Sequence, residues 1–416
     1  MNNDNKQVLS EVEGLVPKYR FPEFKNDGSW LLDKIGNIFT VTRGQVLSMS
    51  KVVENIDSEN IYPVFSSQTK NGGLAGYYKD FLFQNAITWT TDGANAGDVN
   101  FRQGKFYCTN VCGVLLNSEG FANVFFAEIL NTVTRSHVSY VGNPKLMNGV
   151  MSDIIIPFPK LKEQQKIAAC LSSLDDVIAG HEEKLTALEE HKKGLMQNLF
   201  PQEGETQPKY RFPEFENDGD WVETNVGMNC KVKGRIGYRG YTTDDLVNPN
   251  EGAIVIGGKH IQNNRIELSD PTFLSWEKYY ESPEIMVELN DIIFSQRGTL
   301  GDCAIIDIEL GKATINPSMV LLKEISCNTK FLYYTLISDI IQNEVKKFKT
   351  LAAIPMLSQK QINGFKFYIP NPAEQQKIAA TLSTVDALIV AQREKIEALK
   401  EHKNGMMQGL FPKIES

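Results

Sequence analysis

Apolar residues recur at alternating steps of four and three along residues 163–200, and the same spacing returns along residues 374–411. A strict seven-residue repeat keeps one apolar seam of a helix facing a partner helix, which is typical of a coiled coil. Neither stretch contains a proline, and Pro201 and Pro412 follow their ends, where helices usually stop. The pattern therefore predicts two long helices of 38 residues each.

The two stretches are copies of one another. At an offset of 211 residues, 23 of the 38 aligned positions are identical without a gap, so the chain contains an internal repeat. A large region precedes each of the two long helices, and a shorter repeat stands near the start of each region. Its copies, Pro17–Trp30 and Pro208–Trp221, agree at 12 of 14 positions. The repeats predict two similar frames, each with its own helix.

Connectivity sets the direction of the two helices. The first helix leads from one large region to the next, and the second helix starts from that next region, so a pair of them must run antiparallel. Polar residues interrupt both seams at matching places, and such residues often fix the register; they are His181 with Gln392 and Lys192 with Lys403. The sequence predicts an α+β fold in which two pseudo-symmetric heads are joined by two long helices that form an antiparallel coiled coil.

Four segments follow from this division. A first head is expected at residues 1–160, a helix with its linker at 161–207, a second head at 208–370 and a second helix at 371–416. Both heads contain short β-like runs separated by turns rich in glycine and asparagine. Helical patterns occur at 121–133 and 331–348. The interiors of the two heads show little similarity in sequence, which predicts that each head binds a different ligand or a different part of one ligand. The repeated opening segments are expected to pack against the helices, through Tyr19, Phe21, Phe24 and Trp30 in the first copy.

Composition changes this picture little. The chain has 416 residues, a hydrophobic fraction of 42% and a charged fraction of 23%, which are ordinary values for a globular protein. The start lacks the basic and apolar regions of a signal peptide, and no apolar run is long enough to span a membrane, so we expect a cytoplasmic protein. The net charge is −8, yet residues 1–160 carry 14 basic and 15 acidic side chains. Charge alone leaves nucleic-acid binding open.

Motifs for catalysis or metal binding are missing from the sequence. Cys108 and Cys112 lie close together, but neither a second pair nor a nearby histidine completes a zinc set, and the segment that contains them is interpreted as a buried strand. The sequence has no phosphate-binding loop, because Gly311 and Lys312 are followed by Ala313. No set of histidines suggests a nucleophile and its base. We therefore predict no catalytic residue and no metal site.

Polar and basic side chains gather instead in the glycine-bearing loops of both heads. Asn and Gln can pair with adenine, Arg and Lys with guanine, and Ser and Thr with either, while several of these also contact phosphates. The alternative is that these are ordinary solvated turns. The candidates for contact with nucleic acid are Arg43, Ser67, Gln68, Thr69, Lys70, Asn71, Thr91 and Asn95 in the first head, and Lys233, Arg235, Tyr238, Arg239, Lys259, His260, Arg265, Gln296, Arg297 and Thr299 in the second.

Several phrases carry a resemblance to a known family. They are YPVFSSQTKNGG, ITWTTDGANAG, NDIIFSQRGTLG and the apolar run that leads into EQQKIA at the start of each long helix. With these phrases and its doubled helix, the chain resembles the DNA-specificity subunit of type I restriction–modification systems over nearly its whole length. The doubled helix with its entry phrase is the specific part of this resemblance.

The resemblance implies separate roles for the heads, the helices and the partner subunits. Each head would be a target-recognition domain that reads one half of a bipartite, asymmetric site in double-stranded DNA, and the helices would set the spacer between the halves. The helices would also dock two methylation subunits, which carry S-adenosylmethionine and the adenine-N6 chemistry, and through them the ATP-driven restriction subunits. The chain itself would be a non-catalytic specificity subunit without a bound cofactor, since S-adenosylmethionine, ATP and Mg are expected on its partners. In such an assembly the isolated chain is expected to bind DNA weakly.

Apolar residues outside the seam are candidates for docking the methylation subunits. An equal alternative is that some of them widen the apolar core between the two helices. They are Val177, Met196, Phe200, Leu388, Val390, Met407 and Phe411.

Two other functions remain open at this point. A non-enzymatic, two-headed structural or glycan-binding adaptor would be favoured if the chain bound neither DNA nor a methylation subunit. An enzyme in its own right would require the purified chain to methylate or cut DNA.

Overall fold

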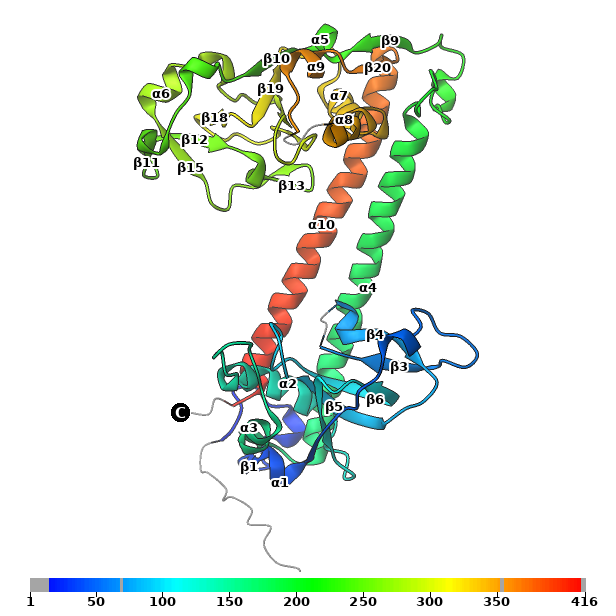
Figure 1. Cartoon of the computed structure of the whole chain (residues 1–416), viewed down its shortest axis with the longest axis vertical. Coiled ribbons are helices and arrows are strands. Elements are labelled where there is room, and N and C mark those ends of the chain that lie inside the picture. Colours follow the sequence, from blue (N-terminus) through cyan, green and yellow to red (C-terminus); the bar gives the residue numbers. More distant parts are fainter. Residues whose placement is uncertain (1–14, 68–69, 352–354, 413–416) are drawn as a thin grey trace, which may run out of the picture. The chain divides into compact units, whose positions relative to one another are not determined.

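The computed structural model describes residues 15–67, 70–351 and 355–412. The chain divides into two compact units (Figure 1). Unit 1 comprises Met1–Glu182 with Glu394–Ser416, and unit 2 comprises Glu183–Arg393. Each unit therefore contains one head and a part of each long helix, α4 (Leu161–Leu199) and α10 (Pro372–Leu410). Both predicted helices are confirmed.

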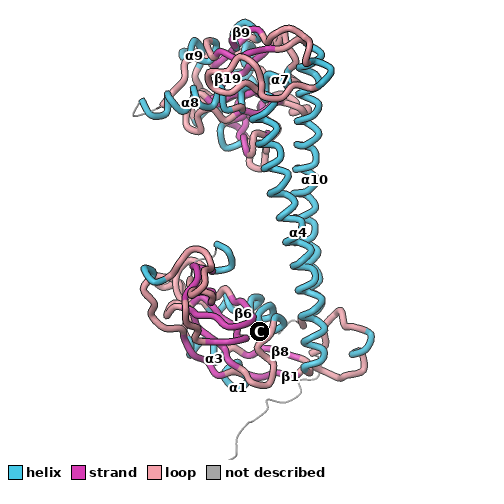
Figure 2. Tube along the Cα trace, turned by 90° about the vertical axis from the view of Figure 1, so that its right-hand side faces the viewer, coloured by secondary structure: helices cyan, strands magenta, loops and turns pink. Residues whose placement is uncertain are grey.

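Within each unit the segments of α4 and α10 lie side by side (Figure 2). Their ion pairs show that they run antiparallel. The residue number in α4 rises as that of its partner in α10 falls. The ion pairs that show this are Asp175 with Lys403 at 2.7 Å and Glu182 with Lys400 at 2.8 Å in unit 1, and Glu189 with Arg393 at 2.5 Å and Asp386 with Lys192 at 2.7 Å in unit 2. The predicted antiparallel pairing is therefore confirmed in each unit.

The matching seam lysines take part in this pairing. Lys403 donates to Asp175 and also to Glu128 of head 1, at 2.9 Å. Burial by itself lowers the pKa of Lys403, but the two carboxylates outweigh it and raise the pKa above its ordinary value. Lys192 makes the equivalent pair with Asp386 in unit 2. These polar positions thus tie the helix pair together at matching places, and in unit 1 they also tie it to the head.

Head 1 is built on a six-stranded sheet of order β2-β7-β5-β6-β3-β4, while β1 and β8 form a separate pair. The side chain of Asn123 caps the N-terminus of α2 by accepting a hydrogen bond from the amide of Phe126. Helix α2 buries its aromatic residues against the sheet. The elements are β1 (Leu31–Lys34), α1 (Ile35–Ile38), β2 (Thr40–Arg43), β3 (Tyr62–Phe65), β4 (Leu74–Tyr78), β5 (Phe83–Thr90), β6 (Val99–Cys108), β7 (Cys112–Leu116), α2 (Val124–Val133), α3 (Asn148–Asp153) and β8 (Ile155–Phe158).

Head 2 repeats this plan with more, shorter strands. Its two main sheets have the orders β10-β19-β16-β17 and β11-β15-β12-β18. The elements are β9 (Val222–Asn225), α5 (Val226–Asn229), β10 (Lys231–Gly234), β11 (Leu246–Val247), β12 (Gly252–Ile256), β13 (Ile261–Gln262), β14 (Arg265–Ile266), β15 (Thr272–Ser275), α6 (Trp276–Tyr280), β16 (Ile292–Ser295), β17 (Cys303–Ile305), β18 (Ala313–Ile315), β19 (Met319–Lys323), α7 (Thr329–Ile337), α8 (Asp339–Leu351), α9 (Gln359–Asn363) and β20 (Lys366–Ile369).

The interiors of the heads are more alike than their sequences suggest. The order β2-β7-β5-β6 in head 1 corresponds to β10-β19-β16-β17 in head 2. The long strand β6 of head 1 pairs antiparallel with β5 and parallel with β3. In head 2 this strand is divided into β17, which pairs antiparallel with β16, and β18, which pairs parallel with β12. The two interiors therefore share a strand order although their sequences show little similarity.

Two local predictions also need correction. The segment 331–348 is not one helix, because α7 ends at Ile337 and Ser338 separates it from α8. The segment around the two cysteines is not one strand: β6 ends at Cys108, a turn follows, and β7 begins at Cys112. The helix expected at 121–133 is confirmed as α2.

The repeated opening segments fasten each head to a long helix. Arg20 donates to both carboxylate oxygens of Glu163 on α4, at 2.8 and 2.7 Å, and these hydrogen bonds raise the pKa of the arginine. Trp30 donates to the same carboxylate at 3.4 Å. Arg211 repeats the double contact with Glu374 on α10, at 2.9 and 2.6 Å. The predicted packing of this segment against the helices is confirmed for Trp30.

The end of each long helix completes the core of a head. Phe411 packs on Phe125 of head 1 with ring centroids 5.6 Å apart, and Phe200 packs on Phe331 of head 2 at 5.5 Å. Both terminal phenylalanines are buried, with exposed fractions of 7% and 2%. Phe200 and Phe411 are therefore not open to a docking partner, in contrast to the expectation, because burying a phenylalanine contributes roughly 1.5–3 kcal/mol and the head cores provide that burial.

Candidate nucleic-acid interface

Each head has a glycine-rich turn after its central strand, and the two turns share one hydrogen-bond pattern. In head 1 the turn follows β5, and in head 2 it follows β16. Gly93 and Gly298 adopt φ values of 97° and 74°, in the left-handed region that favours glycine. The backbone hydrogen bonds are Thr90 N to Asp98 O at 3.0 Å and Gly97 N to Thr90 O at 2.9 Å in head 1, and Ser295 N to Asp302 O at 2.8 Å and Gly301 N to Ser295 O at 3.0 Å in head 2.

Three further loops surround this turn at the same end of the sheet. In each head, the backbone joins the turn to the loop before β7 or β19 and to the loop that carries a Pro-X-Leu segment. The hydrogen bonds are Thr91 N to Val111 O, Leu146 N to Thr91 O and Thr109 N to Phe65 O in head 1, and Gln296 N to Ser318 O, Leu357 N to Gln296 O and Asn316 N to Ile256 O in head 2, all between 2.9 and 3.1 Å. We call these loops the loop face: residues 65–67, 91–97, 109–111 and 144–146 in head 1, and 256–258, 296–301, 316–318 and 355–357 in head 2.

The side chains differ at equivalent positions of the two loop faces. The residue before the left-handed glycine is Asp92 in head 1, where its carboxylate lies 3.8 Å from the ammonium of Lys145. The equivalent residue in head 2 is Arg297, whose Nε lies 2.7 Å from Sδ of Met356. One backbone scaffold thus presents an acid–base pair in one head and an exposed guanidinium in the other. Such a difference suits recognition of two different sequences of bases.

The candidates in head 1 lie on or next to its loop face. Ser67 and Asn95 are partly buried loop residues. Thr91 is buried, and its hydroxyl is 2.7 Å from Asp92 and 3.0 Å from the carbonyl of Val111, so its side chain supports the turn instead of facing solvent. Arg43 ends β2 and is partly buried, with no partner for its buried Nε. Gln68 and Thr69 lie outside the described residues, and Lys70 and Asn71 belong to a short 3-10 helix, Lys70–Gly73.

Three candidates of head 2 come together on its loop face. Gln296, Arg297 and Thr299 occupy the glycine-rich turn. The amide of Gln296 donates to the carbonyl of Pro317 at 2.9 Å, which holds that side chain across the face. Arg297 and Thr299 are exposed. Arg297 therefore offers its guanidinium to a ligand from a fixed backbone.

Other candidates of head 2 are engaged within the head. Arg235 contacts the hydroxyl of Thr314 and the carbonyl of Ile315, both at 3.2 Å, and burial lowers its pKa. Arg239 lies 3.3 Å from Glu284. Both arginines therefore stabilise the head itself: Arg235 donates to the carbonyl of Ile315, and Arg239 pairs with the charge of Glu284.

His260 is also a structural residue, in contrast to the expectation. It is buried, its Nδ1 accepts from the amide of Gly257 at 3.1 Å, and its Nε2 lies 3.2 Å from the carbonyl of Asp270. Lys259 is exposed beside the same Asp270 at 3.0 Å. The remaining candidates are Lys233 on β10, Arg265 on β14, 4.0 Å from Asp307, and Tyr238 in a 3-10 helix at Gly237–Arg239.

Four residues of the loop faces were missed by the sequence reasoning. Lys145 and Met356 share an offset of 211 residues, which is the offset of the two long helices, and each lies between a proline and a leucine. That alignment could have revealed them. Thr109 and Asn316 are equivalent only through their backbone hydrogen bonds to Phe65 and Ile256, at 2.9 Å each, and no sequence pattern marks them.

The docking candidates on the long helices separate by exposure. Val177 of α4 is 45% exposed and Leu388 of α10 is 52% exposed. They occupy equivalent positions of the repeat, 211 residues apart. Val390 is partly buried, and Met196 and Met407 pack against the cores of head 2 and head 1, respectively. Val177 and Leu388 are therefore the apolar pair that remains open to a partner.

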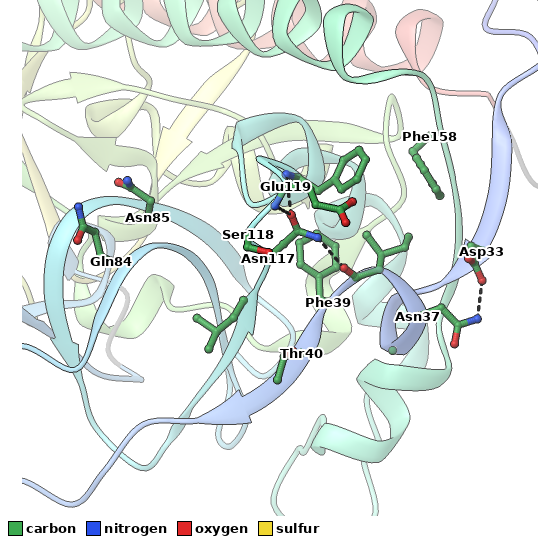
Figure 3. Close-up of a pocket in the computed structure, with 14 residues that line it drawn as sticks. Asp33, Asn37, Phe39, Thr40, Gln84, Asn85, Asn117, Ser118, Glu119 and Phe158 are labelled. Carbon is green, nitrogen blue, oxygen red and sulfur yellow. Dashed lines mark hydrogen bonds between the residues drawn. The ribbon is translucent and has the colours of Figure 1, made fainter. Parts of the chain in front are cut away.

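A cavity of about 800 Å³ lies at the other end of the head 1 sheet (Figure 3). β2 leads from Thr40 in the cavity to Arg43 beside the loop face, and β5 leads from Gln84 in the cavity to the glycine-rich turn. Asp33 and Glu119 line the cavity together with amide and apolar side chains, and no Lys or Arg is among its lining residues. This lining does not favour a phosphate.

Two further findings concern the described residues only. Among them, no group of three His, Cys, Asp or Glu side chains is placed to hold a metal ion. Nor does that part of the chain contain a helix long and apolar enough to cross a membrane.

The comparisons with known proteins agree with one another. A family model described as type I restriction modification DNA specificity domain matches residues 29–190 and 220–401. The specificity subunit of the type I restriction enzyme MjaVIII of Methanocaldococcus jannaschii is 21% identical over 426 residues, covering 98% of this chain and 95% of that protein. The N-terminal part of a putative type I specificity subunit of Mycoplasma pneumoniae is 40% identical over 143 residues, covering 34% of this chain and 75% of that sequence.

The fold has a relative among solved structures. The crystal structure of the S subunit of a type I restriction–modification system from M. genitalium matches with a TM-score of 0.62 and 18% identity, covering 96% of this chain and all of that one. This chain therefore shares its fold with that S subunit.

Proposed function

The chain belongs to the family of type I restriction–modification specificity subunits, and from that premise we propose that head 1 and head 2 each read one half of a bipartite, asymmetric DNA site. The observation that carries this proposal is the pair of loop faces. Their backbones follow one hydrogen-bond pattern, whereas the equivalent side chains differ, with Asp92 and Lys145 in one head and Arg297 and Met356 in the other. Equivalent scaffolds with different donors and acceptors favour two different half-sites.

The long helices have a separate role in the proposal. They set the number of unread base pairs between the half-sites, which is supported by the unbroken length of 39 residues in each. They also dock two methylation subunits at equivalent positions. Those partners supply S-adenosylmethionine and the adenine-N6 chemistry, and they recruit the restriction subunits that use ATP and Mg. The chain itself contributes recognition and assembly rather than catalysis.

Replacing Arg297 by alanine is expected to weaken DNA binding by about 1–3 kcal/mol and to relax discrimination at one base pair of the half-site read by head 2. The reason is that this exposed guanidinium is held by the glycine-rich turn and can donate two hydrogen bonds to guanine. The measurement is equilibrium binding of the assembled methyltransferase to duplexes that vary at each position of both half-sites.

Lys312→Ala is the matched control for Arg297→Ala. It removes the same charge from head 2, but Lys312 precedes β18, whereas the loop face follows that strand. A uniform loss across all duplexes in Arg297→Ala, with a shallower dependence on salt, would indicate a phosphate contact and contradict base reading.

The docking proposal is tested by a charge at both exposed apolar positions. The double variant Val177→Lys with Leu388→Lys is expected to weaken association with the methylation subunits at least about tenfold, because a lysine cannot be buried in an apolar contact without cost. The measurement is titration of the purified chain with methylation subunit. Both sites are exposed, so the thermal stability of the free chain should stay nearly unchanged.

Glu190→Lys with Glu401→Lys is the control for the docking test. These residues are also exposed and 211 positions apart, and the helical repeat of 100° per residue places them on a different face from Val177 and Leu388. Equal affinity for the methylation subunit in both double variants would rule out this docking site.

A further inference from the structure

Two exposed apolar residues of head 1, one of them the most exposed large apolar residue described in the chain, lie at the tip of a loop that leads into its loop face. Tyr140 is 67% exposed and Val141 is 92% exposed. They are adjacent in sequence and are followed by Gly142, whose φ of 76° turns the chain back. These two adjacent apolar side chains do not contribute to the core of the head, and exposed apolar surface can serve as a contact site for a partner.

The loop is held rigidly at its base. Ser139 and Lys145 exchange two backbone hydrogen bonds, at 2.9 and 3.0 Å. The carbonyl of Pro144 accepts from the amide of Gly93 at 3.0 Å, and Lys145 forms a backbone bridge and an ion pair with Asp92. The base of the loop is therefore joined to the glycine-rich turn, which restricts where the tip can lie. A contact made by such a loop loses little conformational entropy on binding.

The apolar side chain at the tip favours an apolar contact with a base over a contact with a phosphate. The side chain of Val141 has no hydrogen-bonding atom, so it cannot bind a phosphate oxygen. In the major groove of DNA, the apolar feature that distinguishes one base pair from another is the 5-methyl group of thymine. Lys145, at the base of the same loop, is exposed and carries a charge of the sign that the DNA backbone attracts. Head 2 also exposes an apolar residue in the equivalent loop, Met356.

We propose that Val141 is a specificity-determining residue of head 1, and that it packs on the 5-methyl group of a thymine in the major groove, with Tyr140 beside it against the neighbouring base edge. This inference rests on the proposed function, because it takes the loop face of head 1 as the surface that reads DNA. A half-site that receives an adenine methylation contains at least one thymine opposite that adenine, so the contact has a partner in every half-site of this kind.

The test replaces each thymine of the head 1 half-site by deoxyuridine, which removes only the 5-methyl group. With the assembled methyltransferase, one such replacement is expected to lower the affinity for DNA about fourfold, the value of one buried methyl group. In the variant Val141→Ser, affinity for the unmodified duplex falls by a similar factor, and the same deoxyuridine has no further effect. Val150→Ser is the control, because Val150 is an exposed valine of α3 in the same head.

Two outcomes overturn the inference. If deoxyuridine lowers the affinity of wild type and Val141→Ser equally, or of neither, then Val141 does not contact a thymine methyl group. If Val141→Ser instead weakens association with the methylation subunit and leaves every duplex ranked as before, then the tip is a protein contact. Failure of the proposed function looks different, since the assembled methyltransferase would then show no preference for any bipartite duplex.

Discussion

Replacing residues 31–158 by the corresponding head of another family member is expected to change one half of the methylated site completely and to leave the other half unchanged. The replaced segment runs from the first residue of β1 to the last residue of β8, so it contains the whole loop face of head 1. It leaves Arg20, Trp30 and Glu163 in place, and these residues fasten the head to α4. The measurement is long-read mapping of methylated adenines in cells that express the hybrid with its methylation subunits.

The same exchange in head 2, over residues 222–369, is the matched control. It should alter the opposite half-site and retain the one that the first hybrid lost. A hybrid that changes both halves, or that folds and changes neither, would contradict the assignment of one half-site to one head. A change in the spacer would instead show that a head, rather than the helix pair, sets the distance between the half-sites.

Glu163→Ala is expected to destabilise unit 1 by about 3–5 kcal/mol, because it leaves a buried guanidinium without its counter-charge. The side chains of Arg20 and Glu163 are only 7% and 2% exposed, so water cannot take over the role of the carboxylate. Trp30 loses a hydrogen-bond acceptor in the same variant. The measurement is thermal unfolding, in which a loss of 3 kcal/mol lowers the midpoint of a unit of this size by about 6–12 °C.

Asp176→Ala and a double variant control this result. Asp176 is an exposed acidic residue of α4 in the same unit, and its removal should change stability by less than about 0.5 kcal/mol. Arg20→Met with Glu163→Met replaces both partners by apolar side chains and should recover much of the loss. If the double variant is as unstable as Glu163→Ala, then lost packing, and not an uncompensated charge, explains the effect.

The frame of the molecule could be predicted from the sequence because it depends on periodic and repeated residues. The seven-residue apolar repeat predicts α4 and α10, and connectivity predicts that they pair antiparallel, as Lys403 with Asp175 and Lys192 with Asp386 confirm. The bounds of the predicted helices differ from the observed ones by only one or two residues at each end.

The head interiors could not be predicted in the same way. Part of their equivalence is carried only by backbone hydrogen bonds, such as Thr109 N to Phe65 O and Asn316 N to Ile256 O, which leave no common side-chain pattern. The sequence likewise does not tell a polar loop residue that faces solvent from one that supports the loop. His260 and Arg235 are both of the right type for DNA, yet their polar atoms contact the head itself.

The nearly identical fastenings of the two heads have a consequence for how such chains diversify. Arg20 with Glu163 and Arg211 with Glu374 form the same joint, and Phe411 and Phe200 close the two cores in the same way. Recombination between the coding regions of these repeats could therefore transplant one head into the other's position without a new core having to arise. If each head reads one half-site as proposed, a chain with its heads transposed would recognise the same two half-sites in the opposite order along the duplex.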